Sequence, residues 1–135
     1  MKDLSYSIAV ALVAALSSCS PVVPYQEDIN VAVLGYVEEF QVPDSCARNY
    51  IPVRLKGVIG ESAAFSFDRI NYAQTDSLFR IGVWGRQIQK TGVEYATIHV
   101  GFDTVLVLQT TKVGQYFIDV VAGNGLFRDT TYVHQ

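Results

Sequence analysis

The chain has 135 residues, of which half are hydrophobic and 17% are charged, and its formal net charge is −3. This length suits one domain, and ten Lys and Arg against thirteen Asp and Glu leave no basic surplus for a phosphate backbone, so nucleic acid is not an expected partner. Apolar residues are too abundant, and charges too sparse, for an intrinsically disordered chain.

The N-terminus has the pattern of a secretory signal. Lys2 precedes an unbroken run of nine apolar residues, 8–16, which is too short to span a bilayer and has the length of a signal-peptide core. Leu16-Ser17-Ser18-Cys19 then resembles the lipobox of bacterial lipoproteins, in which an apolar residue and two small residues precede a cysteine. The alternatives are an ordinary secretory peptide cut near Ser17 and a buried N-terminal helix.

The lipoprotein resemblance implies that the chain is cleaved before Cys19, that the Cys19 thiol carries lipid, and that the protein is anchored to a membrane without spanning it. Ser20 stands where lipoproteins of an inner membrane often have Asp, so the resemblance implies an outer membrane. The prolines of residues 20–28 favour extended backbone. We therefore predict a signal peptide over 1–18, a lipidated cysteine and tether over 19–29, and a β-domain over 30–135.

Beyond residue 29 no stretch keeps a helical period, whereas Val, Ile, Tyr, Phe and Thr recur at the spacing of short strands. A less regular strand is expected over 31–37. In 50–59 the apolar side chains alternate with Arg54 and Lys56, as in a strand with one buried face. Phe65 and Phe67 are expected to share a face in the next run.

The following runs have the same pattern. Phe79, Ile81 and Val83 are expected to face the core, and a strand is expected over 95–100. The run 104–108 shows no polar face, which predicts a place in the middle of a sheet.

The C-terminal part predicts a hairpin. Residues 116–122 alternate, Gly123-Asn124-Gly125 tolerates the positive φ of a tight reversal, and residues 127–133 alternate again. The strand entry Gly114-Gln115-Tyr116 resembles that of immunoglobulin-like sandwiches, in which a tyrosine hydroxyl caps the corner. The disulfide of antibody domains is missing, which leaves relatives without the bridge.

These runs predict an all-β fold, an immunoglobulin-like antiparallel β-sandwich of about seven to eight strands. The alternative is an eight-stranded up-and-down barrel, because the links after residue 50 are short enough for successive strands to pair. Such a barrel would carry a small apolar ligand.

The sequence contains no motif for a nucleophile elbow, a phosphate loop, a zinc protease or a paired Cys-x-x-Cys site, so we expect no enzyme activity, cofactor or metal. A hydrolase, the minor alternative, would depend on His99, which is expected in mid-strand. Acidic and amide residues between strands suggest turns more than calcium ligands, because their spacing matches no defined loop; they are Asp68, Asn71, Asp76, Asp103 and Asp129.

Two further groups are candidate sites. Cys46 is either a half-buried thiol, or a thiol that forms an intermolecular disulfide or is a reactive thiolate favoured by Arg48. Arg80, Trp84 and Arg86 share one side of their strand if Phe79 and its alternating neighbours face the core, and this side would bind a sugar ring or a carboxylate. The competing register buries Trp84 beside a bulge marked by Gly82 and Gly85.

The sequence therefore predicts an exported, lipid-anchored cell-envelope protein whose β-domain binds a partner protein or a surface glycan, or has a structural role. The membrane is an expected partner through Cys19.

Overall fold

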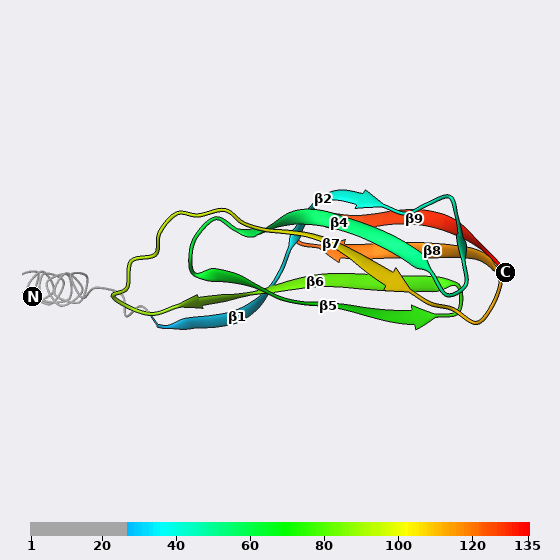
Figure 1. The fold of residues 1–135 in the computed structure, drawn as a ribbon. Helices are drawn as coiled ribbons and strands as arrows, with labels where there is room; N and C mark the ends of the chain where they lie inside the picture. The colour runs from blue at the N-terminus through cyan, green and yellow to red at the C-terminus, as the bar shows by residue number, and fades with distance from the viewer. Residues whose placement is uncertain (1–26) are drawn as a thin grey trace, which may run out of the picture.

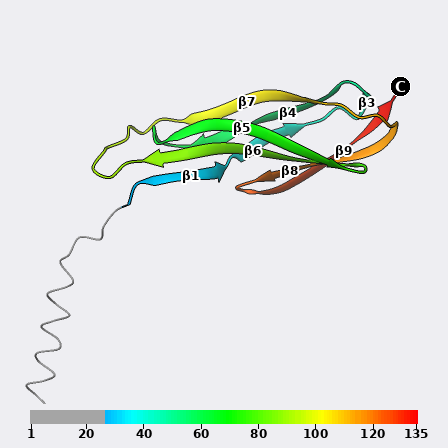
Figure 2. The same ribbon diagram turned by 90° about the horizontal axis from the view of Figure 1, so that it is seen from below.

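The computed structural model describes residues 27–135, so the predicted signal peptide, the lipobox-like residues and Cys19 lie outside the described residues. Nine strands form two sheets that pack into an elongated sandwich (Figures 1 and 2). The strands are β1 (Ile29–Leu34), β2 (Tyr36–Gln41), β3 (Ser45–Ala47), β4 (Ile51–Gly60), β5 (Phe65–Thr75), β6 (Leu78–Gln89), β7 (Val100–Leu108), β8 (Gly114–Ala122) and β9 (Gly125–His134). The all-β sandwich prediction is confirmed. Residues 27–135 include no helix long and apolar enough to cross a membrane.

The large sheet has six strands in the order β1-β6-β8-β9-β3, with β5 paired to the other edge of β6, and the small sheet has the order β2-β4-β7. The barrel alternative is wrong, because the strands form two sheets with free edges instead of one closed sheet. The sheets are also not purely antiparallel: β6 and β8 run parallel. The reason is that β7, which lies between them in the chain, belongs to the small sheet, so that the chain reverses twice before it returns.

The hydrophobic core lies between the sheets, and the alternation predicted for β4, β6 and β8 is confirmed. Phe79 and Ile81 of β6 and Ile118 of β8 are fully buried, while Arg54 and Lys56 of β4 are exposed. Burial of a large apolar side chain stabilises the fold by about 1.5–3 kcal/mol. The full set of buried apolar residues is Val37, Cys46, Ile51, Val53, Leu55, Ile59, Ala64, Phe79, Ile81, Val83, Phe102, Leu108, Tyr116, Ile118, Val120, Ala122 and Val133.

The predicted strand over 31–37 is two strands that belong to different sheets, with Gly35 at the crossing. The Gly35 amide donates to the Val83 carbonyl at 2.9 Å, and the Gly35 carbonyl accepts from the Gly123 amide at 3.0 Å. A Cβ atom on Gly35 would lie 3.0 Å from Phe102 and 3.1 Å from Ile59. Only glycine therefore fits this crossing without displacing core side chains.

The predicted hairpin is confirmed, but its Asn124 has a different role. Positive φ occurs at Gly125 and not at Asn124. The Asn124 side chain instead accepts from the Val37 amide at 3.0 Å and donates to the Val37 carbonyl at 2.9 Å. It takes the place of a peptide group beside the bulge of β2, between Val37 and Glu39, and joins the two sheets.

Two local predictions are wrong. Residues 93–99 form no strand, and β7 begins only at Val100. The run 104–108 lies at the edge of the small sheet, not in its middle, so Val105 and Val107 are exposed. Phe65 and Phe67 pair in continuous register with Gln87 and Gly85, so they lie on one side of β5 as predicted; Phe65 packs against the core, whereas Phe67 is exposed, and a bulge follows between Phe67 and Arg69.

The predicted hydroxyl cap of Tyr116 is present. The Tyr116 hydroxyl donates to the Lys112 carbonyl at 2.9 Å, so it accepts from the Thr110 hydroxyl, whose oxygen lies 2.6 Å away. The ring itself is buried and packs against Phe79, with the ring centroids 5.7 Å apart. The hydroxyl thus fixes the turn between β7 and β8.

Replacing Tyr116 with Phe keeps the buried ring and leaves the Lys112 carbonyl without its donor. We expect the free energy of unfolding to fall by about 1–2 kcal/mol, measured by urea denaturation. Tyr132→Phe is the matched control, since the Tyr132 side chain is exposed, and it should change stability by less than about 0.5 kcal/mol. An equal loss in both variants would contradict a specific role of the Tyr116 hydroxyl.

Candidate functional site

The strand β6 presents Arg80, Gly82, Trp84 and Arg86 on the outer side of the large sheet. Their neighbours Phe79, Ile81 and Val83 are buried, so the register that puts the ring outside is the one the structure has. Trp84 is half-buried. The alternative register, which buries Trp84, requires a bulge in β6. The bulge lies instead in the neighbouring strand β5, next to Trp84.

A hollow of about 300 Å³ lies on this outer side, and Gly82 forms its floor. The Trp84 indole N–H donates to the Asn71 side-chain oxygen at 3.0 Å. Both groups lie directly over the glycine, because a Cβ atom on Gly82 would be 2.8 Å from Trp84 Nε1 and 2.9 Å from Asn71 Oδ1. The residues that line the hollow are Leu34, Asn71, Tyr72, Ala73, Arg80, Ile81, Gly82, Trp84 and Val121.

The hollow lies where β6 changes its neighbour. β1 pairs with β6 as far as Leu34, which lies opposite Trp84. β8 pairs with β6 as far as Val121, which lies opposite Gly82. Between these two points the chain leaves the large sheet through Gly35. The outer surface therefore lacks a side chain at Gly82, and β1 ends beside it at Leu34.

One arginine lies over the Trp84 ring, and a second lines the hollow beside it. The Arg69 guanidinium lies 5.8 Å from the ring centroid and is paired with Asp68 at 2.6 Å. Arg80 lines the hollow and is exposed. Arg86 donates to the Asn30 side chain at 2.7 Å and does not line the hollow. Arg80, Trp84 and Arg86 were predicted to form one ligand-binding face. The structure brings Arg80 and Trp84 together at the hollow and directs Arg86 toward β1.

Asp119 of β8 lies next to Arg80 of β6, and its carboxylate is fully buried. Arg128 of β9 binds both of its oxygens, at 2.6 Å and 2.8 Å, and the Arg128 guanidinium lies 5.3 Å from the Phe117 ring centroid. The hydrogen bonds from Arg128, aided by the charges of Arg128 and Arg80, lower the pKa of Asp119, although burial opposes the shift. The carboxylate therefore remains charged at neutral pH. Sequence reasoning missed this pair, because Asp119 stands in a run of apolar residues.

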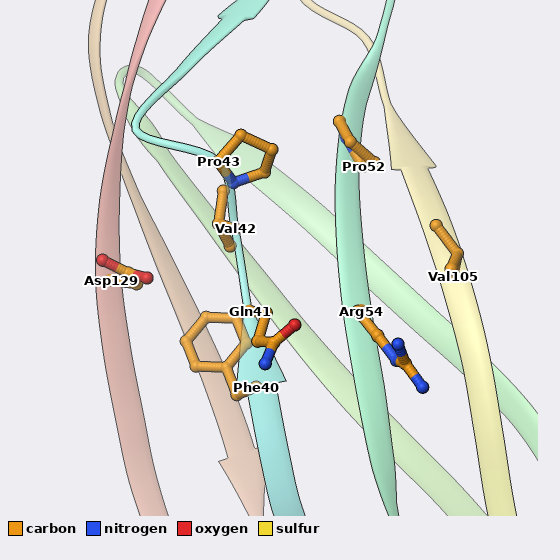
Figure 3. A pocket seen from close by; sticks show the side chains of 8 residues that line it. All are labelled: Phe40, Gln41, Val42, Pro43, Pro52, Arg54, Val105 and Asp129. Carbon is orange, nitrogen blue, oxygen red and sulfur yellow. The ribbon is translucent and has the colours of Figure 1, made fainter.

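A second hollow, of about 510 Å³, crosses the edge of the small sheet and was not predicted from the sequence. Figure 3 shows Asp129 on one side of the segment 40–43 and Arg54 on the other; the lining residues are Phe40, Gln41, Val42, Pro43, Pro52, Arg54, Val105 and Asp129. Arg54 already pairs with Asp103 at 3.5 Å, and the Asp129 carboxylate accepts from the Thr130 amide at 2.8 Å. Because both charged groups have partners, this hollow is the weaker candidate.

The remaining candidates are dispersed. His99 lies in the irregular segment before β7, not in mid-strand, and pairs with Glu61 at 3.1 Å; no serine hydroxyl is hydrogen-bonded to it in the part of the chain that the structure describes. Cys46 is buried, and its sulfur lies 3.2 Å from the Thr131 hydroxyl oxygen. An intermolecular disulfide would require this part of the fold to open. Within 27–135 no three His, Cys, Asp or Glu side chains are grouped to hold a metal ion.

Comparisons of the chain with protein-family models, with curated proteins and with solved structures found no match.

We expect Arg128→Met to lower the free energy of unfolding at pH 7, because it leaves the buried Asp119 carboxylate without its hydrogen-bond donor. The loss should be about 2 kcal/mol, less than for a fully buried pair, since Arg128 is half exposed. The Asp119 pKa lies below its unfolded value near 3.8, so the stabilisation is present above that value and is lost as the pH falls through the folded pKa.

The deficit of the Arg128→Met variant should therefore shrink between pH 7 and about pH 3, as measured by urea denaturation at each pH. Arg54→Met is the control, since it breaks an exposed pair and should cost less than about 1 kcal/mol. A deficit that is the same at both pH values would show that lost packing of the Arg128 stem, not the buried charge, is responsible.

Proposed function

We propose that this protein is a lipid-anchored binding module of a bacterial cell envelope, and that it binds a saccharide at the Trp84 hollow. The observation that carries the proposal is the Trp84 ring, which is held by Asn71 over Gly82 and borders a surface hollow together with the unpaired Arg80. An aromatic ring supplies a flat apolar surface for a sugar ring, and polar groups beside it fix the orientation of the ligand.

The composition of the hollow supports binding without catalysis. Its polar side-chain groups are an amide, a guanidinium and an indole, because the Tyr72 ring lies on the core side against Phe79. The lining includes no carboxylate, imidazole, thiol or aliphatic hydroxyl. General acid–base or nucleophilic catalysis requires groups of those kinds at the bound substrate. A module that holds its ligand unchanged therefore fits this chemistry best.

The anchor rests on the lipobox residues Leu16 to Cys19, which lie outside the described residues. The first described residues and β1 lie at one end of the sandwich, and the C-terminus lies at the other (Figure 1). The hollow lies at the end of β1 opposite to residue 29, where Leu34 pairs with Trp84.

A partner protein is the second candidate, supported by apolar side chains on the outer side of β8 and β9. Phe117, Leu126 and Tyr132 are exposed there, with relative exposures of 39%, 60% and 53%. Exposed aromatic and apolar groups on one face of a sheet are typical of protein interfaces. These side chains lie outside the Trp84 hollow, so the two candidates can be tested separately.

Trp84 is the only tryptophan, so its emission reports on the hollow alone. We expect soluble protein that begins at Ser20 to show a saturable shift of this emission when envelope polysaccharides are added. Trp84→Ala should weaken binding at least about tenfold in calorimetry, because it removes the stacking surface. The control Tyr50→Ala removes an exposed aromatic ring that does not line the hollow and should bind like the wild type. An emission that no saccharide changes would contradict the proposal and favour the partner protein.

Cys19→Ala tests the anchor in the full-length chain. We expect the protein to move from the membrane fraction to the soluble fraction of the envelope, because no acyl chain can be attached to alanine. Partitioning into a detergent phase measures the change. The control Cys46→Ala removes the other cysteine and should leave the protein in the membrane. Membrane retention of the Cys19 variant would contradict the lipid anchor.

A further inference from the structure

The charges around the Trp84 hollow narrow the class of ligand. Four of the six arginines of the chain lie on the outer side of the large sheet, although the whole chain is acidic; they are Arg69, Arg80, Arg86 and Arg128. Asp68 and Asp119 neutralise Arg69 and Arg128. The surface around the hollow therefore keeps an excess of positive charge, carried by Arg80 and Arg86.

Only one of these two guanidiniums is free to bind a ligand in the hollow. Arg86 is held by Asn30. Arg80 is the register neighbour of Asp119, but Arg128 already binds both oxygens of that carboxylate. The Arg80 guanidinium has no hydrogen bond or ion pair to any residue in 27–135, and it is exposed at the rim of the hollow.

The other polar group of the hollow is also a donor. The Trp84 N–H can only donate, so its partner on Asn71 is the side-chain oxygen, and the Asn71 NH₂ group has no hydrogen bond to another of residues 27–135. Arg80 and Asn71 thus present N–H groups to a hollow that has no acidic lining residue. A complementary ligand must supply acceptor oxygens, at least one of them anionic.

Resting on the proposed function, we infer that the hollow binds an acidic saccharide, and that Arg80 binds the carboxylate of a uronic acid unit while its sugar ring lies on Trp84. A guanidinium presents two parallel N–H groups that match the two oxygens of a carboxylate. The ring, the amide donor and the guanidinium then each contact a different part of one sugar unit. Selectivity for the acid over its neutral ester follows from Arg80.

The test uses three oligosaccharides of equal length: oligogalacturonate, its fully methyl-esterified form and a sulfated neutral oligogalactoside. Calorimetry and Trp84 emission measure affinity for the full mature chain. We expect oligogalacturonate to bind at least about tenfold more tightly than the ester, because the ester cannot accept charge-assisted hydrogen bonds from Arg80. The sulfated oligomer should bind more weakly than oligogalacturonate, since its tetrahedral anion fits the planar guanidinium less well.

Arg80→Gln should remove the preference for the acid and leave the affinity for the ester unchanged. Arg54→Gln makes the same change of net charge on the small sheet and should keep the preference. Arg80→Lys retains a positive charge beside Asp119 and should show an intermediate preference, which guards against a folding defect in Arg80→Gln. Thermal denaturation of each variant reports whether it is folded.

Each contrary result has its own meaning. Equal affinity for the acid and the ester would overturn the carboxylate inference but leave saccharide binding intact. Equal affinity for the carboxylated and the sulfated oligomers, or an equal loss in Arg54→Gln and Arg80→Gln, would reduce the effect to general charge attraction and overturn it too. If none of the three oligosaccharides binds or changes the Trp84 emission, the proposed function itself fails at this hollow.

Discussion

The crossing of the chain at Gly35 is the constraint on which the rest of this structure depends. Gly35 is hydrogen-bonded to Val83 of β6 and to Gly123 at the end of β8. The crossing is therefore bound to both of the strands that border the Trp84 hollow. Asn124 extends this connection by binding the backbone of Val37 on the other sheet. Because the chain leaves the large sheet here, β1 ends and β8 takes its place beside β6. The hollow over Gly82 is a direct consequence of this change of neighbour.

Burial of one carboxylate explains why one arginine remains unpaired. Asp119 lies among apolar neighbours on β8, and its desolvation is offset by the two hydrogen bonds from Arg128. Once both oxygens are bound, the nearby Arg80 adds favourable charge but has no oxygen left to bind. Arg80 therefore keeps its guanidinium directed to solvent. Among the buried side chains of residues 27–135, no nitrogen or oxygen atom is left without a partner, so this unused donor capacity lies only at the surface.

The sequence predicted those parts of the fold in which the burial of one strand face decides the pattern. Ile51 to Ile59, Phe79 to Val83 and Tyr116 to Ala122 alternate because one side faces the core. Of the two registers that the sequence left open for β6, the structure has the one with Arg80 and Trp84 on the outer side. The pattern fails where an edge strand tolerates apolar residues on both sides. This is the case for Val105 and Val107, which are exposed at the edge of the small sheet.

Other features depend on contacts between distant parts of the chain, and no local pattern reports them. The pairing of Asp119 with Arg128 requires the register of the last hairpin, and the contact of Asn124 with Val37 spans 87 positions. The hollow itself requires the end of β1 to meet the end of β8. The sequence could therefore supply Trp84 and Arg80 as candidates, but not the Asn71 amide that fixes the ring, nor the reason why Arg80 alone remains free.

The arrangement at the hollow argues for a prepared site over a defect of packing. A defect of packing leaves space between the sheets, lined by apolar groups, whereas this hollow opens on the outer side and is bordered by hydrogen-bond donors. Trp84 is oriented by a hydrogen bond as well as by contact, so a ligand meets a ring that is already in place. A ring held in place before binding loses little conformational freedom when a ligand arrives, and this raises the affinity that a small contact area can give. In the proposed complex, two donor groups beside one oriented ring select the ligand by where its oxygens lie.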